Sequence, residues 1–99
     1  MPGIVVDKEK IAAFCREWKI RELSVFGSVL RSDFRPDSDI DILISFAEED
    51  QWTIADWIEM LDDLRQIFGR EVDLVEKEML RNPYRRYEIL RTREVLYAA

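Results

Sequence analysis

Two short motifs, Gly27-Ser28 and Asp39-Ile40-Asp41, constrain this sequence more than any other feature. Each borders an apolar segment, and a polar stretch with arginines and a proline lies between them. If Ile40–Phe46 is a strand, the side chains of Asp39 and Asp41 share one face, and their backbones stand about 7 Å apart. Two ionised carboxylates beside a buried strand repel each other, and a divalent metal that prefers oxygen ligands relieves this cost. The pattern therefore predicts a magnesium site where this strand begins.

The length of 99 residues predicts one domain over residues 1–99, and hydrophobic periodicity predicts its helices and strands. Helices are expected after Asp7, from Thr53 to Gly69, and from Asn82-Pro83 to Arg93; strands are expected at Ile20–Phe26, Ile40–Phe46 and Glu71–Val75, with a weak strand or tail at Val95–Tyr97. The segment Ile40–Phe46 is expected to be the most buried strand, because apolar residues occupy nearly every position.

Several side chains are assigned to the interior by the same periodicity. On the second helix, the residues expected to be buried are Ile54, Trp57, Ile58, Leu61, Leu64 and Phe68. The lone Cys15 falls on the apolar stripe of the first helix and is expected to be a small buried hydrophobic residue. Trp52 is expected to pack rather than to stack on a nucleotide base, and packing is also the expectation for Tyr84, Tyr87 and Tyr97.

Charge and composition exclude several functional classes. The chain carries 21 acidic against 15 basic residues, a net charge of −6, which argues against broad binding to phosphate backbones. It has no histidine, so histidine-based metal sites and acid–base catalysis by histidine are excluded. No stretch approaches the roughly 20 apolar residues of a membrane span, and the single cysteine allows no internal disulfide. We expect a cytoplasmic protein with no membrane and no direct nucleic-acid partner, whose chemistry rests on carboxylates.

A third carboxylate, Asp73, lies on a later strand and completes a candidate catalytic set with Asp39 and Asp41. Three carboxylates on adjacent strands can bind two magnesium ions roughly 4 Å apart, one at the attacking hydroxyl and one at the phosphates of a nucleotide. The turn at Gly27-Ser28 offers backbone N–H groups and a hydroxyl to those phosphates, and Arg31 can neutralise their charge. This arrangement is typical of phosphoryl or nucleotidyl transfer.

The spacing from Gly27-Ser28 to Asp39-Ile40-Asp41, with Asp73 following, resembles the signature of the DNA polymerase beta-like nucleotidyltransferase superfamily. In length and layout the chain resembles the minimal nucleotidyltransferases of the MntA-type antitoxins, and the segment from Leu80 to Tyr97 is similar to their C-terminal part. The resemblance implies an α/β (α+β) fold with a small mixed sheet flanked by helices. It also implies that Asp39, Asp41 and Asp73 hold the metals, while Gly27, Ser28 and Arg31 bind the nucleotide.

That family implies a reaction and a partner. Its members silence HEPN-domain ribonuclease toxins by transferring AMP from ATP to a tyrosine of the toxin, with release of pyrophosphate, and Asp73 would help to deprotonate this tyrosine. Two alternatives stay open from the sequence. The protein can act as an antitoxin by complex formation alone, without catalysis, or it can transfer a nucleotide to a small molecule such as an aminoglycoside or to RNA.

Overall fold

A four-stranded mixed sheet lies at the centre of the computed structural model, which describes residues 6–27, 39–47 and 52–99. The elements follow in the order α1 (Lys8–Glu17), β1 (Ile20–Phe26), β2 (Ile40–Phe46), α2 (Ile54–Phe68), β3 (Val72–Glu76), the 3₁₀ turn η2 (Lys77–Met79), α3 (Pro83–Thr92) and β4 (Glu94–Ala98). The strand order is β3-β2-β1-β4, in which β1 is antiparallel to β2 and β4, and β3 is parallel to β2. The predicted mixed sheet flanked by helices is confirmed, and β2 is one of its two inner strands.

Local sequence signals set the ends of the helices. The Asp7 side chain accepts hydrogen bonds from the first turn of α1, and Thr53 forms a capping box with Asp56 at the start of α2. Gly69 ends α2 in the left-handed conformation, and Asn82 caps α3 just before a proline in the first turn. These three predicted helix starts are confirmed. None of the helices in the described ranges has the length and the apolar composition of a membrane span.

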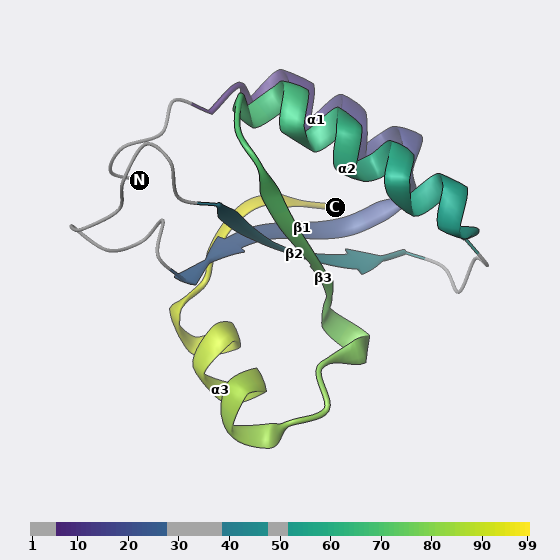
Figure 1. The fold of residues 1–99 in the computed structure, drawn as a ribbon. Helices are drawn as coiled ribbons and strands as arrows, with labels where there is room; N and C mark the ends of the chain where they lie inside the picture. The colour runs from purple at the N-terminus through teal and green to yellow at the C-terminus, as the bar shows by residue number, and fades with distance from the viewer. Residues whose placement is uncertain (1–5, 28–38, 48–51) are drawn as a thin grey trace.

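The main core lies on one face of the sheet, beneath α1 and α2. Figure 1 shows these two helices side by side on that face and α3 on the opposite face. Alternate residues of the strands point to α1 and α2, namely Leu23 and Val25 of β1, Ile40, Ile42 and Ile44 of β2, and Val72 and Leu74 of β3. The helices contribute Ile11, Phe14, Cys15, Trp18, Met60, Leu64 and Phe68. We call this side the two-helix face.

The opposite face, which we call the α3 face, carries the other set of alternating residues. A smaller core forms there, where Ile89 of α3 packs with Phe26 of β1 and Leu43 of β2. By the same alternation, Asp41 of β2 and Asp73 of β3 point to this side of the sheet. The sheet therefore separates Asp41 and Asp73 from the main core.

Burial corrects the predicted stripe of α2. Ile54 and Ile58 are 80% and 52% exposed, whereas Met60, which was not expected inside, is fully buried. With 3.6 residues per turn, the buried face is centred on Met60, Leu64 and Phe68, so that the two isoleucines lie to its side. The expectation that Tyr84 and Tyr87 pack is also wrong, because both side chains are exposed on α3.

The predictions for Cys15 and Trp52 are confirmed. Cys15 is completely buried, and desolvation raises the pKa of its thiol to about 12, with the nearby charge of Arg16 acting weakly in the opposite direction. Such a thiol stays protonated at neutral pH and behaves as a hydrophobic residue. Trp52 packs against Trp18 in an edge-to-face arrangement, with ring centroids 5.3 Å apart, and also contacts Phe46.

Candidate active site

Two of the predicted carboxylates lie side by side on the α3 face. Asp41 of β2 and Asp73 of β3 are register partners in the parallel pair, so their side chains project from neighbouring strands in the same direction. Paired strands are about 4.8 Å apart, which brings the two carboxylates within reach of one cation. Asp41 is half-buried, and Asp73 on the edge strand is exposed. The helical connection through α2 makes this pairing, because it returns the chain parallel to β2 and next to it.

Gly27 lies directly against the Asp41 carboxylate. It follows the last residue of β1, Phe26, whose register partner on β2 is Asp41. Its φ of +75° lies in the left-handed region, and a Cβ added to it would stand 2.3 Å from Asp41 Oδ2. Two independent reasons therefore favour glycine here: the left-handed backbone conformation and the close approach of the Asp41 carboxylate. The structure brings together the glycine and the aspartate that the sequence motifs had singled out.

Asp39 lies just before β2 and is exposed. The adjacent Ile40 N–H donates to the Glu71 carbonyl at 3.0 Å, which fixes the start of β2 beside the start of β3. Asp39 therefore enters the sheet at the end where Asp41 and Asp73 meet. Ser28 and Arg31, the other predicted nucleotide-binding residues, lie outside the described residues.

The donor set at this end of the sheet suits magnesium. Within the described ranges, no three carboxylate or thiol side chains gather closely enough to enclose a metal ion by themselves. Magnesium does not need such an enclosure, because it is usually held by one or two carboxylates together with substrate phosphates and water. The paired carboxylates of Asp41 and Asp73 meet that requirement, with Asp39 beside them. Their roles as metal ligands and catalytic residues stay predictions.

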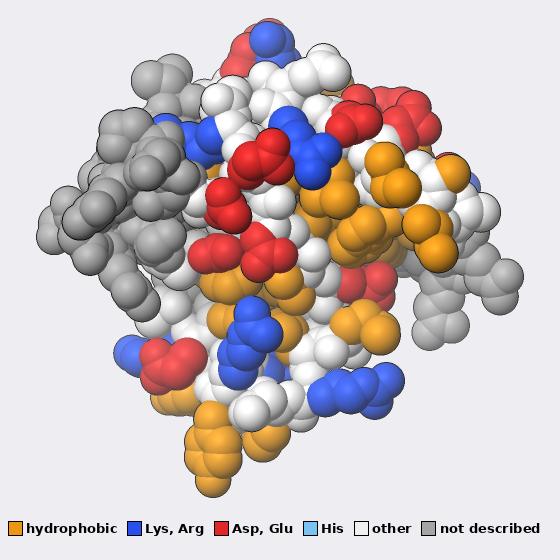
Figure 2. All heavy atoms as spheres, viewed as in Figure 1, with side chains coloured by type: hydrophobic (Ala, Val, Ile, Leu, Met, Phe, Trp, Pro, Cys, Tyr) orange, Lys and Arg blue, Asp and Glu red, His pale blue; other side chains and the backbone are white. Residues whose placement is uncertain are grey.

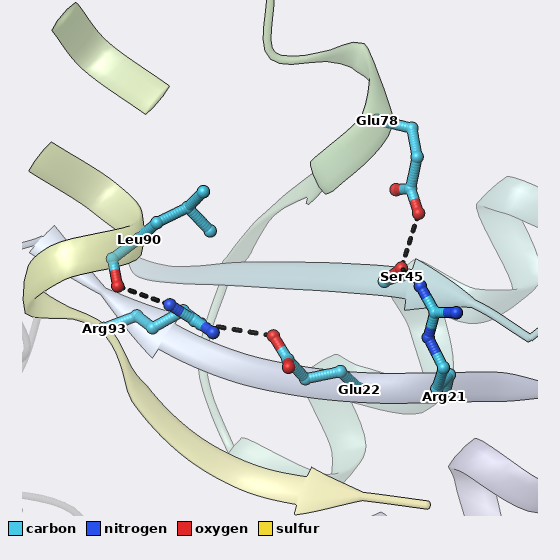
Figure 3. A network of polar contacts seen from close by, with 6 residues as sticks. All are labelled: Arg21, Glu22, Ser45, Glu78, Leu90 and Arg93. Atoms are coloured by element: carbon cyan, nitrogen blue, oxygen red, sulfur yellow. Dashed lines mark hydrogen bonds and ion pairs between the residues drawn. The ribbon is translucent and has the colours of Figure 1, made fainter. Parts of the chain in front are cut away.

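A polar network fixes α3 against the sheet (Figure 3). Arg93, at the end of α3, forms an ion pair with Glu22 of β1 at 3.2 Å, and it also donates to the Leu90 carbonyl. On β2, the buried Ser45 accepts a hydrogen bond from Arg21 at 3.1 Å and donates to Glu78 of η2. These contacts hold both ends of the η2–α3 segment to the strands: Glu78 is bound near the end of β2 away from Asp39, and Arg93, which precedes the pairing of Glu94 with Val25, reaches back along β1 to Glu22.

Sequence reasoning missed this network. The Arg93–Glu22 pair joins residues 71 positions apart, and no local pattern announces such a contact. Ser45 carried one usable signal, because a single hydroxyl within an apolar strand needs a partner when it is buried.

The half-buried Glu76 at the end of β3 has a raised pKa. Burial is the main cause, since it penalises the ionised form, and the charge of Glu78 adds to it. Because the pKa of Glu76 is higher in the folded than in the unfolded state, its contribution to stability is fully present below the unfolded pKa. This contribution is lost as the pH rises through the folded pKa.

Glu76→Gln is therefore expected to raise the melting temperature at pH 7, and the gain over wild type should shrink towards zero below a pH of about 4. Thermal melts followed by circular dichroism at both pH values measure this. Glu59→Gln, on the exposed surface of α2, removes the same charge and serves as control. An equal gain for both variants, or a gain that does not depend on pH, would contradict the assignment.

A groove of about 360 Å³ lies between α1 and α2 and is unrelated to the carboxylate pair. Its walls include Phe14 and Glu17 of α1 and Glu59 and Asp63 of α2. Since both helices cover the two-helix face, the sheet separates this groove from Asp41 and Asp73. The candidate site therefore lies outside this groove.

Comparison with known proteins identifies the family. The nucleotidyltransferase domain family matches residues 8–96. The protein adenylyltransferase MntA of Thermococcus cleftensis is 37% identical over 78 residues, which cover 79% of this chain and 74% of that protein. A crystal structure of a toxin–antitoxin with AMP-PNP contains a chain with a TM-score of 0.72 and 24% identity, covering 95% of this chain and 75% of that one.

A second structure, of the tri-AMPylated Shewanella oneidensis HEPN toxin in complex with MNT antitoxin, contains a chain with a TM-score of 0.63 and 23% identity. The match covers 93% of this chain and 70% of that one. At this identity, the two solved structures establish the shared fold. The family match over most of the chain and the identity to the archaeal enzyme establish more: this chain belongs to the nucleotidyltransferases and is an enzyme of the MntA-type protein adenylyltransferase family.

Proposed function

We propose that this chain is the antitoxin of a HEPN toxin–antitoxin pair and transfers AMP from ATP to a tyrosine of the toxin, with magnesium as cofactor. The observation that carries the proposal is the in-register pair Asp41 and Asp73, with Gly27 against the Asp41 carboxylate. Support also comes from the archaeal relative, which is named as a protein adenylyltransferase, and from the similar fold found in a complex with an AMPylated HEPN toxin.

The positions of the candidate site residues indicate a separate role for each. Asp39, Asp41 and Asp73 would hold magnesium, which supplies charge neutralisation at the triphosphate and activation of the acceptor hydroxyl. Gly27 leaves the Asp41 carboxylate room to stay in register with Asp73. Asp73 is exposed and lies on the edge strand β3, so we assign it to the side from which the acceptor approaches.

The reaction balances without a further reactant. The tyrosine oxygen forms a bond to the α-phosphorus of ATP, the bond from that phosphorus to the bridging oxygen breaks, and pyrophosphate leaves. Asp73, which lies on the acceptor side, would help to remove the proton from the tyrosine hydroxyl.

Intact mass spectrometry tests the proposal directly. The purified chain, ATP and magnesium are incubated with a HEPN-domain toxin from the same genome, and the toxin is expected to gain the mass of one or more AMP groups on tyrosine. Omission of magnesium is the control and should leave the toxin unmodified. A toxin that is inhibited in the complex but gains no mass would instead support neutralisation by binding alone.

A further inference from the structure

The outer surface of α3 carries side chains that protein interfaces bury. Tyr84 and Tyr87 are 83% and 64% exposed, and Met79, in the preceding turn η2, is 60% exposed. Tyrosine, methionine and arginine are enriched at the cores of protein–protein interfaces. Only Ile89 of α3 is buried, so the helix presents most of its surface to solvent. The exposed aromatic side chains of α3 therefore do not contribute to the core of the fold.

The charge of this surface is opposite to that of the chain. Between Leu80 and Arg93 there are five arginines and one glutamate, whereas the whole chain has a net charge of −6. Figure 2 shows Lys and Arg side chains beside exposed hydrophobic side chains around α3, while Asp and Glu side chains gather over the other half of this view. A basic and aromatic surface on an acidic protein is complementary to an acidic surface with apolar patches.

Contacts within the chain hold α3 in place. Arg86 donates to the Lys77 carbonyl at 2.9 Å, and Arg93 binds Glu22 of β1. The Arg91 guanidinium lies over the Tyr87 ring, 5.8 Å from its centroid, which restrains the tyrosine. A surface that is ordered before binding loses less conformational entropy when a partner docks.

The position of α3 connects this surface to the active site. Ile89 packs on Phe26 and Leu43, and these two residues flank Asp41: Phe26 is its register partner, and Leu43 is the next residue along β2 on the same face. A protein seated on α3 therefore lies on the same side of the sheet as Asp41 and Asp73. A protein seated on α1 or α2 would lie behind the sheet.

We propose that the α3 surface, formed by Met79, Arg81, Tyr84, Arg85 and Tyr87, is the docking surface for the acceptor protein, which meets it with an acidic and apolar patch. This inference rests on the proposed function, because the acceptor is taken to be the HEPN toxin. A protein is favoured over RNA because Arg86, Arg91 and Arg93 are engaged within the chain and because the net charge of −6 opposes binding to a phosphate backbone.

Isothermal titration calorimetry with the HEPN-domain toxin tests the surface. Tyr84→Ala/Tyr87→Ala is expected to weaken binding at least about 100-fold, since exposed tyrosines at such surfaces act as hot spots. The matched control, Ile54→Ala/Ile58→Ala, removes another pair of exposed apolar side chains, from α2, and should bind as wild type. Unchanged melting temperatures are expected for both variants, because all four side chains are exposed.

A charge reversal provides an independent second variant. Arg85→Glu on α3 should weaken binding, most strongly at low salt, whereas Arg16→Glu, with the same change of charge on the exposed side of α1, should not. The docking proposal is overturned if the tyrosine variant binds as wild type or if the α2 variant is the one that loses affinity. It is also overturned if the tyrosine variant loses affinity for an RNA oligonucleotide and not for the toxin.

The two proposals fail in different ways. If the wild-type chain binds the toxin through α3 but adds no AMP, the docking surface stands and the proposed transfer does not. If the wild type adds AMP while the tyrosine variant binds and modifies the toxin normally, the transfer stands and the docking surface does not.

Discussion

Asp41→Asn is expected to lower AMP transfer by about 1000-fold, equivalent to ~4 kcal/mol of transition-state stabilisation, without unfolding the protein. Asp41 is the residue on which the site converges. It is the register partner of Asp73 on one side and of Phe26 on the other, and its Oδ2 lies against Gly27. Asparagine keeps the shape of the side chain but removes the charge that would bind magnesium. Initial rates of AMP incorporation into the toxin measure the loss.

The stability of this variant should stay near that of wild type. Asp41 is half-buried beside another carboxylate, so removing its charge also removes a repulsion from the folded state. Asp62→Asn on the exposed side of α2 is a matched control that should retain full activity, because its ion pair with Arg65 is a surface contact of small energetic value. If Asp41→Asn kept activity within tenfold of wild type, the carboxylate pair would not be the catalytic centre.

The strands of this fold were predictable because their signals are local. Gly27 marks the end of β1, and the segment Ile40–Phe46, in which apolar residues occupy nearly every position, marks a strand buried on both sides. The strand β3 was predicted as Glu71–Val75 and is Val72–Glu76, so both of its ends were placed one residue early. A charged residue stands at each boundary, Glu71 before the strand and Glu76 at its end, and such boundaries are poorly defined by sequence.

Long-range features were less predictable. Periodicity identified α2 but could not orient it, since Ile54 and Ile58 also fit a helical stripe and only packing on the sheet selects Met60 instead. The exposure of Tyr84 and Tyr87 was also not predictable from the sequence. It depends on how α3 packs on the sheet, and this short helix buries little beyond Ile89.

The candidate site was predictable in its residue types and not in its register. The sequence motifs named Asp41 and Asp73 as neighbours, but their direct pairing depends on how the crossover through α2 places β3 against β2. The contact between Gly27 and the Asp41 carboxylate depends on the antiparallel register of β1 and β2 in the same way. Both registers are set by matching the buried faces of three strands at once.

Gly27→Ala is expected to reduce AMP transfer by about 100-fold, even though it adds only one methyl group. The new Cβ would stand 2.3 Å from Oδ2 and 3.3 Å from Cγ of Asp41, so the carboxylate must move away from its position beside Asp73. A displacement of about 1 Å at a reacting centre can cost about 10²-fold in rate. Stability should also fall by about 1 kcal/mol, because alanine is strained at a φ of +75°.

Gly69→Ala separates the two effects. Gly69 ends α2 with a φ of +70°, and an added Cβ there would meet no atom within 4 Å. Both substitutions should therefore cost a similar ~1 kcal/mol of unfolding free energy, measured by urea denaturation, for the same backbone reason. Only Gly27→Ala should lose activity, since only its methyl group displaces the carboxylate that we propose to be catalytic. Equal activity in the two variants would mean that the Asp41 carboxylate can leave its place above Gly27 without cost, and that this contact serves the fold rather than the reaction.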